Sequence, residues 1–197
     1  MKRIWSVCLL LMGMAFSVSA QSFYFDIGIG FGWPTTKIDG NDLSDILSGS
    51  KVTDIGVDLG LKAGYGPFGE IPLYAVGEFA GMGHRFQTSD NYMQFNSYII
   101  GAGLIFYPIP LIQLAGTIGF SYAADQTDLQ DVVLPASERG VAWDLSAAFD
   151  FGKRNSGFLL GLRYFGSSNT LTSNEKQDSS IISVFVRYAF RHKIQQE

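Results

Sequence analysis

Cysteine, charge and long hydrophobic runs are all scarce in this chain of 197 residues. The single cysteine, Cys8, excludes a disulfide framework and a zinc site built on cysteine ligands. Charged residues make up 16%, against roughly 25% in an ordinary soluble domain. Apolar runs of about 20 residues do not recur along the chain, so a bundle of membrane-spanning helices is excluded. Hydrophobic residues nevertheless make up 47% of the total. They must therefore be placed by a fold other than a bundle of membrane-spanning helices.

Positive charge is also in short supply, since 14 Lys and Arg residues stand against 18 Asp and Glu residues. Binding to the phosphates of a nucleic acid requires a basic surface, so we expect no nucleic-acid partner. Only 6 prolines are present, and aromatic residues make up 14%. This composition excludes a disordered or proline-rich linker protein and leaves one ordered domain.

Residues 1–20 have the features of a signal peptide. Lys2 and Arg3 precede an apolar stretch over residues 4–16, and Val18-Ser19-Ala20 places small residues where a signal peptidase cleaves. A permanent N-terminal anchor is disfavoured because the apolar stretch is short and ends in small residues. We therefore predict an exported protein that is cleaved after Ala20 and that loses its only cysteine with the leader.

Strict alternation of apolar and polar or small residues runs through the remaining chain. In Ser22–Trp33 the sequence FYFDIGIGFGW places large apolar residues at every second position, a period that no helix produces. The alternation predicts eight strands; in the third and fourth it does not decide which face each residue takes. The predicted strands are Ser22–Trp33, Asp54–Tyr65, Leu73–Phe86, Phe95–Tyr107, Ile112–Tyr122, Val141–Phe151, Phe158–Phe165 and Ser180–Phe190.

The connections between these strands alternate between short and long. Three are short and rich in Gly, Pro or Asn, as tight turns require: Gly66–Pro72, Pro108–Pro110 and Gly152–Gly157. Four are longer and polar: Pro34–Thr53, Gln87–Gln94, Ala124–Arg139 and Gly166–Ser179. The asymmetry is typical of outer-membrane barrels. It predicts an all-β, eight-stranded antiparallel up-and-down transmembrane β-barrel over residues 21–190, followed by a short periplasmic tail over residues 191–197. The termini and short turns would be periplasmic, and the long loops extracellular.

A soluble lipocalin-like barrel also alternates, but its polar face is exposed and dense in Lys and Glu. Here that face is dense in Gly, Ser and Ala, which suits a crowded lumen better. The apolar face carries aromatic residues near both strand ends, as expected for the two interfaces of a bilayer. The predicted aromatic girdle comprises Trp33, Tyr122, Trp143 and Tyr164 near the loops, and Tyr65, Tyr188 and Phe190 near the turns.

The few charges on the small-residue face form the predicted lumen charge network: Asp26, Asp54, Asp58, Lys62, Glu78, Asp144, Asp150, Arg163 and Arg187. An unpaired ion inside a membrane is costly, so each base should have a carboxylate partner. Counting along the strands places Asp26 near Lys62 or Arg187, and Asp144 near Arg163. The favoured interpretation is an ion-pair network that fills the interior. The alternative is a narrow cation-favouring path along the inward glycines.

Three segments, FYFDIGIGFGW, VAWDLSAAFDF and VFVRYAF, resemble the small eight-stranded outer-membrane barrels typified by the OmpA membrane domain, OmpX and OmpW. The resemblance implies an envelope component with outer-membrane lipids around it, and loops that contact an external ligand. Tyr188 and Phe190 resemble the signal read by the barrel assembly machinery, although the chain continues past Phe190. The OmpW-like members imply a variant role in which a hydrophobic ligand enters from the loop side. Together with the narrow path along the glycines, this leaves a porin-like channel for small or hydrophobic solutes as the alternative function.

Two loops carry acids three residues apart, Asp39, Asp42 and Asp45 in the first and Asp125, Asp128 and Asp131 in the third. Neither has the layout of a calcium loop, so we expect a solvated acidic surface and no metal site. GIGFG lies within a strand and predicts no phosphate-binding loop or cofactor.

A lipid-modifying barrel enzyme would need a His-Ser-acid arrangement at the rim. His84, with Ser89, Asp90 and Ser97 nearby in the sequence, is the only candidate, and no His-x-Ser motif accompanies it. We therefore expect no enzymatic activity.

Overall fold

The structure is a computed structural model that describes residues 23–47, 53–68, 70–88, 91–129, 134–135, 137–152 and 155–191. The predicted leader and residues 192–197 of the predicted tail lie outside the described residues. Among the described residues, no helix has the length and apolar character needed to cross a membrane.

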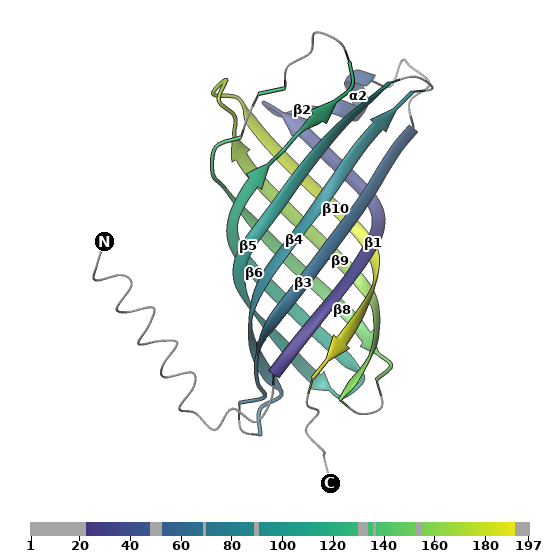
Figure 1. The fold of residues 1–197 in the computed structure, drawn as a ribbon, viewed down its shortest axis with the longest axis vertical. Coiled ribbons are helices and arrows are strands. Elements are labelled where there is room, and N and C mark those ends of the chain that lie inside the picture. The colour runs from purple at the N-terminus through teal and green to yellow at the C-terminus, as the bar shows by residue number, and fades with distance from the viewer. Residues whose placement is uncertain are drawn as a thin grey trace, which may run out of the picture.

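Eight long strands follow one another along the chain as antiparallel neighbours (Figure 1). They are β1 (Phe23–Ile38), β3 (Thr53–Tyr65), β4 (Leu73–Gln87), β5 (Tyr92–Ile109), β6 (Ile112–Ala123), β8 (Gly140–Asp150), β9 (Ser156–Thr170) and β10 (Lys176–Phe190). Pairing of β1 with β10, from Phe25 opposite Phe190 to Ile38 opposite Gln177, closes the ring. The prediction of an eight-stranded antiparallel up-and-down barrel is confirmed. Closure leaves the ring without an open sheet edge.

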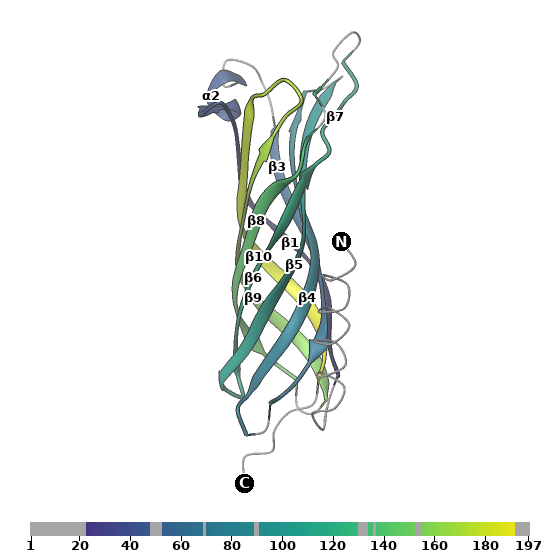
Figure 2. The ribbon, with the colours of Figure 1, turned by 90° about the vertical axis from the view of Figure 1, so that its left-hand side faces the viewer.

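The two ends of the barrel differ (Figures 1 and 2). One end, here called the turn end, holds the start of β1, the finish of β10 and the short connections between strands. The other, the loop end, holds β2 (Asn41–Asp42), α2 (Leu43–Leu47) and β7 (Gln126–Thr127). The short β2 pairs with β1, and β7 pairs with β5.

The strands reach further into the loop end than the alternation predicted. The expected loop Pro34–Thr53 begins with residues that continue β1 as far as Ile38, and it also contains β2 and α2. Most of the expected loop Gly166–Ser179 is strand, because β9 runs to Thr170 and β10 begins at Lys176. Those two predicted loops are therefore wrong in extent. Both faces of these extensions carry mainly polar residues, so hydrogen bonding between strands continues where the apolar alternation stops.

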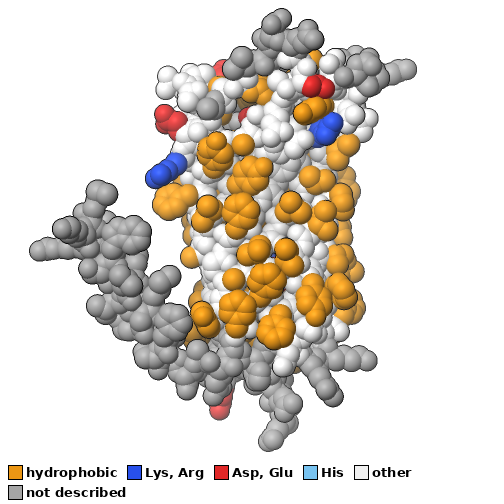
Figure 3. All heavy atoms as spheres, viewed as in Figure 1, with side chains coloured by type: hydrophobic (Ala, Val, Ile, Leu, Met, Phe, Trp, Pro, Cys, Tyr) orange, Lys and Arg blue, Asp and Glu red, His pale blue; other side chains and the backbone are white. Residues whose placement is uncertain are grey.

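Successive residues alternate between the bore and the outer wall. In β8 and β10 the burial changes at nearly every residue, and all large apolar side chains of β8 point outward. Figure 3 shows hydrophobic side chains spread over the wall, with most of the visible charged ones close to the loop end. Most charged side chains of the strands lie buried in the bore, whereas the outer wall between the two ends forms an apolar belt.

Candidate functional site

Ion pairs between opposite walls cross the middle of the bore. Lys62 on β3 donates to Glu78 on neighbouring β4 at 2.6 Å and to Asp144 on β8 at 3.3 Å. In the ring, β3 and β8 are separated by three strands on either side, so they face each other across the bore. All three side chains are fully buried. The contact between Lys62 and Asp144 therefore crosses the bore at this level.

Arg163 on β9 forms a second connection across the bore. Its Nη1 donates to Asp58 on β3 at 2.7 Å, and its Nε donates to Asp144 on the adjacent strand. Its Nη2 lies 3.7 Å from Glu78 on β4, the strand directly opposite β9. The structure thus brings together five of the predicted network residues: Asp58, Lys62, Glu78, Asp144 and Arg163. Each cation has at least two carboxylate partners, which offsets the cost of burying it.

Arg187 is held more loosely than the other two bases. Its Nη1 lies 3.8 Å from Asp26, and its guanidinium stacks over the ring of Phe185 at 4.4 Å. Among the described residues, neither of its terminal nitrogens has a hydrogen-bond acceptor. Asp26 instead accepts a hydrogen bond of 2.6 Å from the hydroxyl of Tyr24. Of the two positions expected for Asp26, the ion pair forms with Arg187, although Lys62 stands opposite Asp26 in the β1–β3 register.

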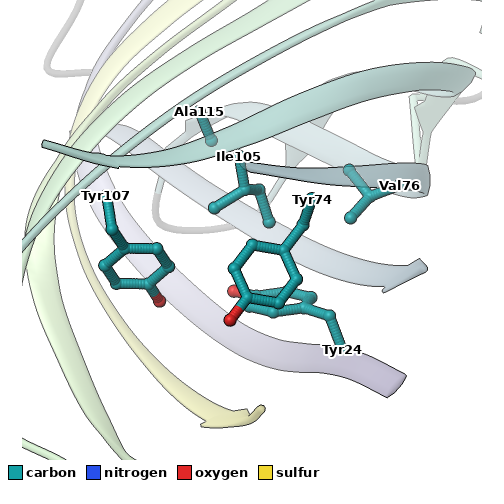
Figure 4. Close-up of a cluster of buried hydrophobic side chains, with 6 residues drawn as sticks. All are labelled: Tyr24, Tyr74, Val76, Ile105, Tyr107 and Ala115. Carbon is teal, nitrogen blue, oxygen red and sulfur yellow. The ribbon is translucent and has the colours of Figure 1, made fainter. Parts of the chain in front are cut away.

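A cluster of tyrosines fills the bore nearer the turn end (Figure 4). Tyr74 contacts Tyr24 in a tilted arrangement and Tyr107 edge-to-face, with ring centroids 5.3 and 6.0 Å apart. The side-chain amide of Gln113 on β6 donates to the hydroxyls of Tyr24, at 2.9 Å, and Tyr107, at 2.7 Å. Because β1 and β6 face each other, the bond from Gln113 to Tyr24 also crosses the bore. In the sequence, the one feature that separates these tyrosines from the outward aromatic residues is their position on the small-residue face.

Arg191 completes the turn-end side of the bore. Its guanidinium pairs with Asp150 and lies 5.6 Å from the ring of Tyr107. Although the sequence places Arg191 in the predicted tail, its side chain is fully buried in the barrel. The sequence does contain a signal for this position. Residues of β10 alternate between outward and inward faces, and Arg191 follows the outward Phe190, so the alternation places it on the inward face. Asp150, predicted for the lumen, is buried here at the end of β8.

At the loop end, His84 joins three strands. Its Nδ1 lies 2.9 Å from the hydroxyl of Thr36 on β1, and its Nε2 lies 2.9 Å from Asp54 on β3. Asp54, predicted for the lumen, has a side chain that is 41% exposed at this rim. Thr36 and His84 are fully buried. The hydroxyl of Ser97 makes no hydrogen bond to His84 within the described residues, and Ser89 and Asp90 lie outside them.

The acids of the loops tie loop segments to the strands. The carboxylates of Asp39 and Asp128 accept backbone N–H groups of Lys176 and Tyr92, at 2.8 and 2.6 Å. Asp125 accepts the backbone N–H of Asn96 at 3.2 Å and the side-chain amide of Gln177 at 3.3 Å. Burial raises the pKa of Asp125 to about 6, against the opposing effect of those two donors.

All six of these loop acids were predicted to form a solvated surface, and the partial burial of Asp125 departs from that prediction. Asp42 accepts from the backbone of Ser44, and Asp131 lies outside the described residues. Within the described part of the chain, no group of three His, Cys, Asp or Glu residues is placed to hold a metal ion.

Known families and curated proteins give no match to this chain, whereas solved structures do. Ail, the attachment invasion locus protein of Yersinia pestis, is 18% identical in its complex with sucrose octasulfate. The match covers 84% of this chain and 97% of Ail, with a TM-score of 0.53. Neisserial surface protein A is 15% identical over 84% of this chain and 95% of its own, with a TM-score of 0.52. The chain has the fold of the small outer-membrane β-barrels.

This outer-membrane barrel fold carries all seven predicted girdle residues on its outer wall. Trp33, the most exposed, is 74% accessible. The others are Tyr65, Tyr122, Trp143, Tyr164, Tyr188 and Phe190. At the turn end, edge-to-face contacts join Tyr65 to Phe23 at 5.9 Å and Tyr188 to Phe158 at 5.4 Å. These pairs lie in the aromatic border at the turn-end side of the apolar belt, where each ring packs against a neighbour.

Proposed function

We propose that this protein resides in a bacterial outer membrane as an envelope component whose loop end contacts external partners. The closed bore carries the proposal, because polar contacts between opposite walls cross it at two levels, Lys62 to Asp144 and Gln113 to Tyr24. A barrel with a blocked interior serves as a scaffold rather than as a pore. Its outer wall, an apolar belt with aromatic borders, suits a bilayer.

The orientation that we propose places the loop end outside the cell and the turn end in the periplasm. The short connections at the turn end support it, since outer-membrane barrels have short periplasmic turns. The outward Tyr188 and Phe190 close β10 at the turn end, where the barrel assembly machinery would act on the final strand. Beyond Trp33 and Ile182, β1 and β10 continue together as a polar sheet that would project from the membrane.

The loop end favours a neutral or basic external partner. Ail was solved with sucrose octasulfate, a heparin analogue, which is a polyanion. At the loop end of this chain acids outnumber bases, with Asp39, Asp42, Asp125 and Asp128 among them. Like charges oppose association, so we propose that a polysulfated ligand is not the partner here.

A non-enzymatic role fits the geometry around His84. The hydroxyl that is hydrogen-bonded to its ring belongs to Thr36, which is fully buried and so cannot reach a substrate. The same contact joins β1 to β4, two strands that are not neighbours in the ring. We therefore assign Thr36, His84 and Asp54 to holding the rim together.

Cysteine labelling in intact bacteria tests the location and the orientation together. In a Cys8→Ser background, Thr172→Cys places a thiol in the exposed β9–β10 connection, and Glu70→Cys places one in an exposed turn. A membrane-impermeant maleimide should label Thr172→Cys in intact cells, and Glu70→Cys only after the outer membrane is permeabilised. The reverse pattern would overturn the orientation, and recovery of both variants in the soluble fraction would overturn the membrane location.

A further inference from the structure

The outer wall formed by β6, β8, β9, β10 and β1 carries two depressions, one above the other. The lower one has a volume of about 520 Å³ and is lined on the outer wall by Leu114, Leu145, Ala147, Leu162, Tyr164 and Ile182. The upper one, of about 570 Å³, lies toward the loop end. Tyr164, a predicted girdle residue, lines both, so the two meet at the aromatic border.

The two depressions differ in chemistry. The outward side chains of the lower depression are aliphatic, apart from Tyr164. Polar side chains line the upper one, including Lys37, Lys176, Ser168 and Ser180. The β1–β10 register places Lys37 opposite Asp178, two residues from Lys176. Lys176 pairs with Asp178 at 3.0 Å, yet its side chain remains 62% exposed and open to a second anion.

We infer that this wall binds one lipid with a phosphate-bearing headgroup, the acyl chain in the lower depression and the phosphate beside Lys37 and Lys176 in the upper. The inference rests on the proposed function only in that this wall faces lipid. Aliphatic side chains are matched to an acyl chain, while two ammonium groups and neighbouring hydroxyls are matched to phosphate oxygens. The aromatic border between them lies where the headgroup of a bound lipid joins its chains.

A third depression, on the wall of β1, β3, β4 and β5, provides an internal comparison. Its volume is about 410 Å³, and Leu59, Phe79, Gly81 and Tyr98 line it, without any Lys or Arg. Arg85, on the same strand as Phe79, stacks over Tyr92 with its guanidinium 4.2 Å from the ring. This wall therefore offers an apolar groove without the exposed ammonium groups of the site on β1 and β10.

Native mass spectrometry of the purified barrel in detergent micelles tests the lipid site. The probes are dioleoyl phosphatidic acid, dioleoylglycerol, which has the same chains and no phosphate, and inorganic phosphate. We expect a one-to-one adduct with phosphatidic acid, and weak or no adducts with the other two. The double variant Lys37→Gln/Lys176→Gln should bind phosphatidic acid about tenfold more weakly, as expected for two ammonium groups near a lipid phosphate.

Two further variants separate the parts of the site. Ala147→Phe fills the lower depression with an outward ring and should weaken the phosphatidic acid adduct while leaving the lysines in place. Arg85→Gln removes a positive charge on another wall and should leave the adduct unchanged. Migration of unheated samples in SDS gels verifies that each variant forms the barrel.

The outcomes distinguish this inference from the proposed function. Equal binding of dioleoylglycerol, or unchanged binding by the double lysine variant, would overturn the phosphate site. Adducts with inorganic phosphate as strong as those with the lipid would overturn the lipid as its occupant. Surface labelling of Thr172→Cys would stand in either case. Loss of that labelling would count against the orientation, and recovery in the soluble fraction would overturn the membrane location itself.

Discussion

Asp144 is the carboxylate that accepts hydrogen bonds from both Lys62 and Arg163, whereas Glu78, which also lies near both cations, accepts one only from Lys62. Asp144→Asn keeps the shape of the side chain and removes the charge that compensates two buried cations. We expect the free energy of unfolding to fall by about 3 kcal/mol, the loss typical of breaking a buried ion pair. Urea unfolding in lipid vesicles measures it. Asp178→Asn, which removes a partly exposed partner of Lys176, should cost less than about 1 kcal/mol; equal losses would contradict this assignment.

Asp125 gives the loop end a pH dependence. Its pKa in the folded protein, about 6, lies above the value of about 4 expected in the unfolded chain. Protonation therefore favours the folded form. The resulting stabilisation is complete below about pH 4 and is lost as the pH rises through 6. Hydrogen exchange at the amide of Asn96, which donates to Asp125, should be slower at pH 4 than at pH 7 after correction for intrinsic rates. In Asp125→Asn this difference should disappear.

The sequence placed the charges on the inner face, but it did not show how they pair. Parity along each strand decides which face a residue takes. The contacts that cross the bore depend on strand tilt and stagger, which bring Arg163 to the level of Asp58 on β3 and Glu78 on β4. The level of a side chain along the barrel axis cannot be read from any local sequence pattern. Likewise, Thr36 and Gln113 were not predicted as partners of His84 and Tyr24, because their contacts link strands far apart in the sequence.

At the scale of elements, a strand is visible in the sequence only where its two faces meet different surroundings. From β1 to β10 the alternation identified each long strand, because one face meets the apolar belt and the other the bore. It failed in Ser167–Thr170 and Lys176–Ser179, where both faces are largely polar although the β9–β10 ladder continues. Polar residues in an antiparallel pair carry no period-two signal, so these segments were taken for loops.

Substitution of Gly30 on β1, with Gly77 on β4 as the control, tests how little space lies between the inner face of β1 and Asp58. A Cβ on the inward Gly30 would lie 2.8 Å from Cγ of Asp58, the carboxylate that holds Arg163, whereas a Cβ on Gly77 of β4 meets no atom nearer than 3.9 Å. Gly30→Ala should therefore displace Asp58 and lower the free energy of unfolding by about 1–3 kcal/mol. Gly77→Ala should be neutral or stabilising by up to about 1 kcal/mol. Urea unfolding of the matched pair checks the difference; similar losses would show that the inner face of β1 is not constrained by Asp58.

At the scale of the whole molecule, the contacts across the bore decide between a scaffold and a pore. An eight-stranded ring is just wide enough for its own side chains, and here ionic and tyrosine layers occupy successive levels. In planar bilayers we expect no channel events from the wild-type barrel. A variant with Lys62, Glu78, Asp144 and Arg163 all replaced by Ala keeps the net charge, because two acids and two bases are removed together.

That variant leaves the tyrosine layer, with Tyr24 and Gln113, as the remaining barrier. Adding Tyr24→Ala and Tyr107→Ala removes the rings that fill this level, so the combined variant should show small discrete conductance steps. The unheated variant must migrate as a folded barrel in SDS gels, since loss of the buried ion pairs and rings lowers stability. Channel events from the wild-type protein would contradict a closed bore. Silence in the folded combined variant would place the barrier elsewhere, at the loop end where His84 connects β1 to β3.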